Sequence, residues 1–422
     1  MKHLDYLTGI FLLPGILTVP ASAESIIWGG HTKYQLSQTR YDDDSLFSSV
    51  ATSPATDQTL DFRLKAQKYW GSPWDATFHY QLLGLHGDTL VASRSLPVSP
   101  FRLNTGAISD QQRLFDLTSV ISERDDRILL HRIDRLSLGY SGEQFVARAG
   151  RHIVSWGNGL IYSPMDFFNP FDPAAIDKSY KTGDDMFYTQ WLTQRGNDLQ
   201  GVLVPRREPA SGNVSSDQSS LVFKYHAAAD LTEYDLLAAR HYDDSIMGGG
   251  LAFDWRGSVI RSDLISTYSD RDLTMAFVAS TSYAWSWLNR NISGLLEYYY
   301  NGFGQADGDY SVAALTTNTA LLARISRGEL FTLGRNYLAA GATIEITPLT
   351  ILTPTLFTNL DDGSALLQLL LNYDIKQDFN LLAGFTLPIG PTGTEYGGIP
   401  SRIPGIFLSP GSALFAKLSW HF

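Results

Sequence analysis

The chain of 422 residues contains no cysteine, which excludes disulfides and thiolate-bound metals. It also has no excess of positive charge: 32 basic against 43 acidic residues give a net charge of -11, which argues against a nucleic-acid-binding protein. A third absence is that of any long apolar run, since no stretch approaches the ~20 apolar residues that a membrane-spanning helix needs. Any part of the chain within a membrane must therefore be a closed β-barrel, because only helices and closed barrels satisfy their backbone hydrogen bonds in lipid.

Motifs of catalytic chemistry are missing too. The sequence has no zinc-ligand spacing, no phosphate-binding loop and no haem-attachment motif. Ser419 and His421 share one face of a predicted strand, but that face points inward and lies at the end of the chain, away from where a barrel hydrolase places its Ser-His pair. We therefore expect neither an enzyme nor a protein with a cofactor.

The first residues are typical of a secretory signal. Lys2 precedes a short apolar stretch, Leu7 to Val19, and Ala21-Ser22-Ala23 fits a cleavage site. We predict a signal peptide over residues 1–23 and one outer-membrane β-barrel domain over 24–422. A membrane anchor that stays attached is the alternative reading of the same stretch.

What the sequence has instead is period-two alternation. Segments of about ten residues alternate apolar and polar side chains, as a strand with one face on lipid and the other on water requires. About eighteen such segments occur, within a range of 16–18, and we predict an all-β, transmembrane, antiparallel β-barrel. The predicted strands are 26–38, 58–70, 74–86, 127–140, 144–154, 185–194, 198–206, 219–228, 231–242, 246–256, 259–269, 273–285, 291–301, 335–346, 349–359, 365–375, 379–387 and 413–422.

The connections between these segments support the count. Short turns rich in Gly, Pro and Asn follow the even-numbered strands, as expected at the periplasmic end. Every long connection follows an odd-numbered strand, which places the long loops together on the extracellular side. These loops are 39–57, 87–126, 155–184, 207–218, 302–334 and 388–412.

Tryptophan and aspartate gather at opposite ends of the predicted barrel. Trp70, Trp74, Trp255, Trp285, Trp287 and Trp420 lie beside the predicted periplasmic turns, as an aromatic belt at the headgroup level does. Pairs of aspartates lie in or beside the outer loops. One group, Asp42, Asp43 and Asp44, suggests a divalent cation site that would bridge to lipopolysaccharide phosphates. Solvation of a turn is the simpler explanation for any one pair.

The last strand ends the chain on an aromatic residue. Leu418, Trp420 and Phe422 share its apolar face, a pattern that resembles the terminal signal read by the outer-membrane barrel-assembly machinery. The predicted partners are therefore that machinery, the lipid and lipopolysaccharide of the membrane, and a solute.

Inward-facing charges of both signs are predicted to line a water-filled lumen, because about eighteen strands leave room for one. They are Asp61, Arg63, Lys65, Arg148, Lys224, Asp235, Asp254, Arg261, Asp263, Glu297, Glu345, Asp374 and Lys417. Facing bands of opposite charge favour polar or charged solutes. Solvation of the wall by mutually paired charges is an equally good explanation.

The third outer loop, 155–184, is dense in proline and in phenylalanine. Phe167, Phe168 and Phe171 favour burial, and the lumen is the nearest place for it, so we predict that the loop folds inward and narrows the pore. A packed cap on the rim is the alternative. We expect Asp166, Asp172, Asp177 and Lys178 of this loop to stand opposite wall arginines such as Arg63 and Arg148, with His152 at the loop's start.

Local irregularities are also predicted. The segment 127–140 breaks the alternation, since Ile133 and Arg135 share a face, which indicates a β-bulge or a strand that continues beyond the membrane. Two loop stretches, 108–121 and 312–325, have helical spacing and are predicted to form short helices at the mouth, as surface helices or as gates.

Certain motifs resemble those of known barrels. Gly150-Arg151-His152, Ser155-Trp156-Gly157 and Asn169-Pro170 are similar to a pattern in the alginate-export porin group and in a related uncharacterised porin-like family, although the pattern has Gln where His152 stands. The stretches 333–338 and 359–364 resemble the second of these families. The resemblance implies an outer-membrane channel. The mixed sign of the predicted lumen differs from the arginine-rich lumen of alginate exporters.

The sequence thus predicts a porin-like channel of the bacterial outer membrane, reached after export, for diffusion or export of small polar or charged solutes or a polysaccharide. The alternative is a barrel that does not conduct and that sheathes or anchors a secretion or electron-transfer partner. Monomer and homotrimer both remain open, and the sequence does not name a substrate.

Overall fold

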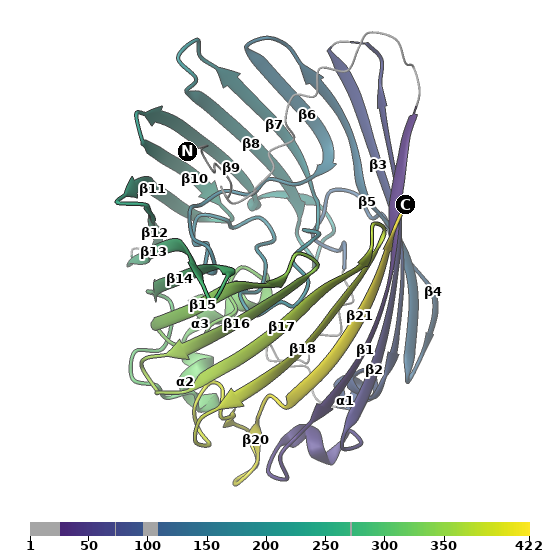
Figure 1. Cartoon of the computed structure of the whole chain (residues 1–422). Coiled ribbons are helices and arrows are strands. Elements are labelled where there is room, and N and C mark those ends of the chain that lie inside the picture. Colours follow the sequence, from purple (N-terminus) through teal and green to yellow (C-terminus); the bar gives the residue numbers. More distant parts are fainter. Residues whose placement is uncertain (1–25, 72, 96–108, 271) are drawn as a thin grey trace.

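The computed structural model describes residues 26–71, 73–95, 109–270 and 272–422, so the predicted signal peptide lies outside the described residues. Nineteen strands form one antiparallel sheet, of which eighteen close into a barrel and β4 is an addition at one end (Figure 1). The barrel closes because β1 pairs with β21 from His31–His421 to Arg40–Ser412. The eighteen strands are β1 (Ile26–Arg40), β2 (Ala55–Tyr69), β3 (Trp74–Gly87), β5 (Arg127–Ser141), β6 (Phe145–His152), β7 (Asp184–Leu192), β8 (Asp198–Arg207), β9 (Val214–Ala229), β10 (Thr232–His241), β11 (Asp244–Trp255), β12 (Ser258–Ser269), β13 (Asp272–Trp287), β14 (Arg290–Asn301), β15 (Asn336–Thr347), β16 (Thr350–Asn359), β17 (Ala365–Lys376), β18 (Phe379–Ile389) and β21 (Ser412–His421).

The predicted barrel is confirmed, and each of the eighteen predicted segments corresponds to one of these strands. The outer face of the wall is apolar and the inner face is polar, which explains why the alternation in the sequence predicted the strands. Leu236 and Leu414 expose about 61% and 60% of their surface on the outer face, whereas Glu297 and Asp263 are fully buried on the inner face. An apolar outer surface around a charged interior is what a barrel in hydrocarbon requires.

The tryptophans mark one end of the barrel. Eight of the nine are exposed and lie near the end with short turns, namely Trp28, Trp70, Trp74, Trp191, Trp255, Trp285, Trp287 and Trp420. The ninth, Trp156, is buried in the connection between β6 and β7. The exposed rings form a girdle of the kind that sits at a membrane interface.

The bulge predicted in β5 is present. Between β3 and β5 the register shifts so that His79 pairs with Arg135 and Tyr80 with Ile133, leaving Asp134 as the extra residue. Asp134 and Arg135 are therefore both buried, although neighbours on a regular strand face opposite sides. One inserted residue thus brings an additional carboxylate to the inner face of the barrel.

The helix predicted over residues 108–121 is wrong. Residues 109–117 form no helix, and residues 118–124 form a strand, β4 (Thr118–Arg124), which pairs with the outer half of β5. The edge of β5 is free there because its pairing with β6 begins only at Leu136. An unpaired edge accepts a strand, and the tight turn at 125–126 delivers one. A helix occurs earlier in this loop, α1 (Asp88–Ser95).

The second predicted helical stretch, 312–325, is present as two short helices, α2 (Val312–Thr317) and α3 (Thr319–Ser326). The side chain of Ser311 caps α2 by accepting from the N–H of Ala314, and Asn318 caps α3 by accepting from the N–H of Leu321. Among the described residues no helix has the length and apolar character needed to cross a membrane. The remaining elements are a 3-10 helix, η1 (Leu46–Ser49), and a two-stranded ribbon of β19 (Ile399–Pro400) and β20 (Phe407–Leu408).

Candidate functional site in the barrel interior

The connection between β6 and β7, residues 153–183 and called the third loop below, contacts the inner wall on two sides. Its first contact is with an acidic wall, which consists of Asp235 on β10, Asp263 on β12 and Glu297 on β14. Asp263 accepts hydrogen bonds from the main-chain N–H and the side-chain amide of Asn158, both at 2.7 Å. Glu297 accepts three successive backbone N–H groups of residues 160–162, at 2.6, 3.0 and 2.6 Å. The loop thus neutralises Asp263 and Glu297 with N–H donors, whereas Asp235 binds the cationic side chain of Lys224.

A glycine in the wall makes this contact sterically feasible. A Cβ atom at Gly250 of β11 would lie 2.5 Å from the side-chain amide nitrogen of Asn158 and 2.7 Å from Oδ1 of Asp263. Neither distance can accommodate a carbon atom. The absence of a side chain at Gly250 therefore lets the loop approach the acidic wall closely enough for the hydrogen bonds to form.

The apolar side of the third loop packs on the same half of the barrel. Trp156, Tyr162, Met165, Phe167 and Phe168 are buried in one hydrophobic cluster with inward-facing residues of the wall. Their wall partners come from β7 to β16, among them Val202, Val222, Ile265, Val278, Tyr299 and Phe357. The prediction that the phenylalanines of this loop seek burial is confirmed for Phe167 and Phe168, while Phe171 is only half-buried.

The second contact of the third loop is with the opposite side of the barrel. Asp177 Oδ2 receives Nζ of Lys33 on β1 at 2.7 Å and Nζ of Lys417 on β21 at 2.5 Å. Farther along the wall, the amide of Gln368 on β17 donates to the carbonyl of Ala174 at 2.9 Å. Burial alone would raise the pKa of Asp177, but the two lysines hold it well below its ordinary value. The carboxylate is therefore ionised at any ordinary pH.

Next to these lysines lies a basic wall, defined here as Lys33, Lys417, Lys65, Arg63, Arg132 and Arg135. Arg63 lies 3.2 Å from Oδ2 of Asp134, and Arg132 and Arg135 bind the same carboxylate. The ring of Tyr180 from the third loop stacks beneath Arg63, whose guanidinium carbon is 3.4 Å from the ring centre. Asp134 and Asp177 together bind five cations, and Asp61 on β2, opposite Lys33, is a third carboxylate beside the six cations of the basic wall. This side of the interior therefore has an excess of positive charge.

Among the described residues, Arg63 and Arg148 bind carboxylates of the barrel wall and not those of the third loop, opposite which they were predicted to stand. Arg148 binds Asp75 at 3.0 Å, and Arg63 binds Asp134. Asp166 binds Lys181 within the third loop at 2.6 Å, and burial, only partly offset by Lys181, raises its pKa. Asp172 accepts the N–H of Ala174, and Lys178 donates to the carbonyl of Pro173. Of the three carboxylates in the third loop, Asp177 binds wall cations, and these are lysines. Asp166 and Asp172 have their partners within the loop itself.

The remaining predicted site residues lie on the inner face but are dispersed. Lys224 binds Asp235 at 2.8 Å, and Arg261 donates to Ser282 at 3.1 Å. His152 is buried and its Nδ1 lies 3.0 Å from the carbonyl of Gly150. Lys65 is partly exposed, 5.5 Å from the ring centre of Tyr180. The outward residues Leu418, Trp420 and Phe422 lie on the exposed face of the last strand and its end.

Several residues that shape the interior were missed in the sequence. Lys33 shares the inner face of β1 with His31, so its alternation could have revealed it. Asp134, Arg132 and Arg135 could not be assigned to one face, because the bulge changes the alternation at that point. Tyr180 and Lys181 gave no signal, since their partners depend on the path of the third loop.

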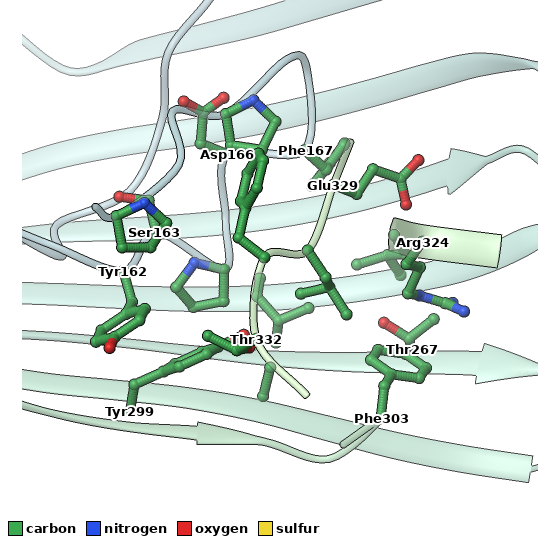
Figure 2. Close-up of a pocket in the computed structure, with 18 of the residues that line it drawn as sticks. Tyr162, Ser163, Asp166, Phe167, Thr267, Tyr299, Phe303, Arg324, Glu329 and Thr332 are labelled. Atoms are coloured by element: carbon green, nitrogen blue, oxygen red, sulfur yellow. The ribbon is translucent and has the colours of Figure 1, made fainter. Parts of the chain in front are cut away.

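The third loop, the connection between β14 and β15 and the inner wall line a small cavity of about 80 Å³ (Figure 2). Phe167, Tyr299 and Phe303 form its apolar lining. The charged side chains at its edge are already paired: Arg324 with Asp244 at 2.5 Å, and Glu329 with His241 at 3.0 Å. The cavity is thus a small, half-open pocket between two packed loops and the inner wall, and its charged groups already have partners.

The cation site suggested by Asp42, Asp43 and Asp44 is not formed. Over the described residues, no three side chains of His, Cys, Asp or Glu come together in a group that could hold a metal ion. Asp42 and Asp43 are exposed to solvent, in agreement with solvation of a turn.

Comparisons with known proteins place the fold. No protein-family model matches the chain, and no curated protein matches it either. Solved structures do match. OccAB3 of Acinetobacter baumannii is 10% identical, and the match covers 94% of this chain and 99% of that chain with a TM-score of 0.53. OccAB2 of the same organism is also 10% identical, and the match covers 95% of this chain and 99% of that chain with a TM-score of 0.54. A BenF-like porin from Pseudomonas fluorescens Pf-5 matches at 10% identity over 94% and 99%, with 0.52. The chain therefore shares the barrel fold of these proteins over almost its whole length.

Proposed function

We propose that this protein is an outer-membrane channel through which small polar or charged solutes diffuse passively, with the third loop narrowing the lumen. The observation that carries the proposal is the anchoring of this loop inside the barrel on opposite walls, at Asp263 and Glu297 on one side and at Lys33 and Lys417 on the other. A segment held across a wide barrel restricts its bore while the rest of the interior stays wet.

We infer that solutes pass along the basic wall, because the exposed side of the third loop lies there. The loop packs its apolar side densely on the wall from β7 to β16, whereas Lys178 and Ser179 at its other side are exposed. Five cations share two carboxylates beside that region. An excess of positive charge in a narrow passage favours anions, so small anionic solutes are the preferred class.

Export, assembly and membrane environment belong to the same proposal. Residues 1–23 direct export, the barrel spans 24–422, and the terminal Leu418, Trp420 and Phe422 are read by the assembly machinery. Lipid and lipopolysaccharide surround the apolar belt, and the assembly is a monomer or a homotrimer. Export of a polysaccharide, as the resemblance to alginate-export porins implies, is the narrower alternative within the channel class.

Conductance in planar lipid bilayers tests the proposal. We expect the purified, detergent-solubilised protein to produce discrete current steps in KCl, and proteoliposomes to swell in small organic anions faster than in neutral sugars of equal size. A folded barrel that carries no current, both intact and after deletion of residues 157–180, would show that the protein is a scaffold for a partner.

A further inference from the structure

Two lysines lie close together on the inner face where the barrel closes. Lys33 of β1 pairs with Ser419, and Lys417 of β21 pairs with Gln35, so the lysines occupy diagonal positions on the two strands that join the ends of the chain. Both side chains are buried. Like charges at neighbouring positions of a strand pair repel each other unless a counter-ion lies between them.

Asp177 supplies that counter-ion in a fixed orientation. Its Oδ2 atom receives both lysines, at 2.7 and 2.5 Å. Its Oδ1 atom receives the N–H and the hydroxyl of Ser179, at 3.0 and 2.6 Å, and the same hydroxyl lies 2.6 Å from Nζ of Lys33. One carboxylate oxygen thus binds the wall while the other binds the loop, so the side chain cannot turn away without losing one set of bonds.

The accessibilities of the three side chains show which of them meets water. Asp177 exposes 31% of its side chain, whereas Lys33 and Lys417 expose only 8% and 7%. The carboxylate and its loop therefore lie over the two ammonium groups. Removal of the carboxylate would expose two positive charges to the same water.

We infer that Asp177 determines both the bore and the ion selectivity of the channel: it tethers the third loop to the closing strands and masks the charges of Lys33 and Lys417. This inference rests on the proposed channel function. The tether positions the free side of the loop, and the masking sets how strongly the passage favours anions.

Asp177→Asn tests both roles in the full-length protein. The matched control is Asp309→Asn, because Asp309 is an exposed loop carboxylate that likewise accepts a backbone N–H two residues ahead, that of Ser311 at 2.9 Å. In a KCl gradient we expect Asp177→Asn to raise single-channel conductance and to shift the reversal potential so that the chloride-to-potassium permeability ratio rises roughly threefold. The control should match the wild type. Equal conductance and reversal potential in the two variants would overturn the inference.

Two further variants separate the tether from the charge. With Lys33→Gln and Lys417→Gln added to Asp177→Asn, conductance should stay high while selectivity returns towards the wild type. Ser179→Ala, which keeps every charge, should raise conductance slightly without changing selectivity, and it remains informative if Asp177→Asn does not fold. Unchanged conductance in Ser179→Ala and in the triple variant contradicts the tether. A wild-type barrel without current contradicts the channel itself, which is a different result from a current that these substitutions leave unchanged.

Discussion

The single carboxylate of Glu297 holds the third loop by accepting three hydrogen bonds from its main chain. It is fully buried on β14 and receives three consecutive backbone N–H groups, an arrangement in which the loop wraps its main chain around one side chain. A carboxylate can accept all three because it has only acceptor sites. The interaction depends on the oxygen atoms at this residue and on the local path of residues 160–162.

The substitution Glu297→Gln should loosen the loop without unfolding the barrel. In glutamine an NH2 group replaces one carboxylate oxygen, and this donor would face the N–H groups of the loop. The free energy that holds the loop on the wall should therefore decrease by about 2–3 kcal/mol. Protease cleavage within residues 153–183 of the detergent-solubilised protein should become faster, while the heat-modifiable migration of the barrel stays. Glu345→Gln is the control, because Glu345 on β15 accepts, within the described part of the chain, a single hydrogen bond from the side-chain amide of Asn291. Equal cleavage rates for both variants would contradict the anchoring role.

Gly250 and Gly249 are neighbours on β11 whose side-chain positions lie on opposite faces of the strand. Alanine substitutions at the two positions therefore form a matched pair. Gly250→Ala would place a Cβ atom 2.5 Å from the amide nitrogen of Asn158, whereas the nearest atom to a Cβ at Gly249 is a carbonyl oxygen 3.8 Å away. We therefore expect Gly250→Ala to displace the loop and to make single-channel current noisier and larger. Gly249→Ala should behave as the wild type. Identical current traces from the two variants would show that the loop does not depend on this close approach.

At the scale of elements, the loops at the mouth are joined through Glu395. This residue lies in the connection between β18 and β21, and its carboxylate receives the N–H of Leu333 at 2.8 Å, the hydroxyl of Tyr337 at 2.7 Å and the amide of Asn359 at 2.7 Å. Its own N–H donates to Asp362 at 2.7 Å. Burial raises the pKa of Glu395 to about 7, although the three donors lower it in part.

The raised pKa of Glu395 makes the stability of this loop junction depend on pH. Because the pKa in the folded protein lies above the ordinary value of 4.5, the stabilisation is fully present below about pH 4.5 and is lost as pH rises through about 7. The midpoint temperature of thermal unfolding should therefore decrease as the pH is raised from 5 to 8. Glu395→Gln, which cannot ionise, should flatten this dependence. A slope that the substitution leaves intact would mean that another group is responsible.

The strands of the barrel were predictable from the sequence because one face of each strand meets lipid. The alternation of Leu60, Phe62 and Leu64 with Asp61 and Arg63 is imposed by the bilayer and can be read without knowing any neighbour. The strand β4 could not be read, because it forms on a free edge of β5 whose existence depends on how short β6 is. Its mixed sequence fits a helical period equally well, and pairing decided against the helix.

At the scale of the whole molecule, the closed barrel followed from the sequence but the contents of its interior did not. Lys33 and Asp177 are 144 positions apart, and Gln368 and Ala174 are 194 apart, so no local pattern links them. The burial of the phenylalanine-rich loop was predictable from composition, since such rings have no place in water. Which wall residue each loop carboxylate binds depends on the path of the loop, so the sequence does not predict that Arg63 and Arg148 bind wall carboxylates instead.

The contact of Asp177 with both terminal strands also has a consequence for biogenesis. A residue from the middle of the chain bridges Lys33 near its beginning and Lys417 near its end, and this bridge can form only once the final strand has been made and delivered. The middle of the polypeptide can thus act as an internal template that receives the last strand and helps to fix its alignment as the cylinder is sealed.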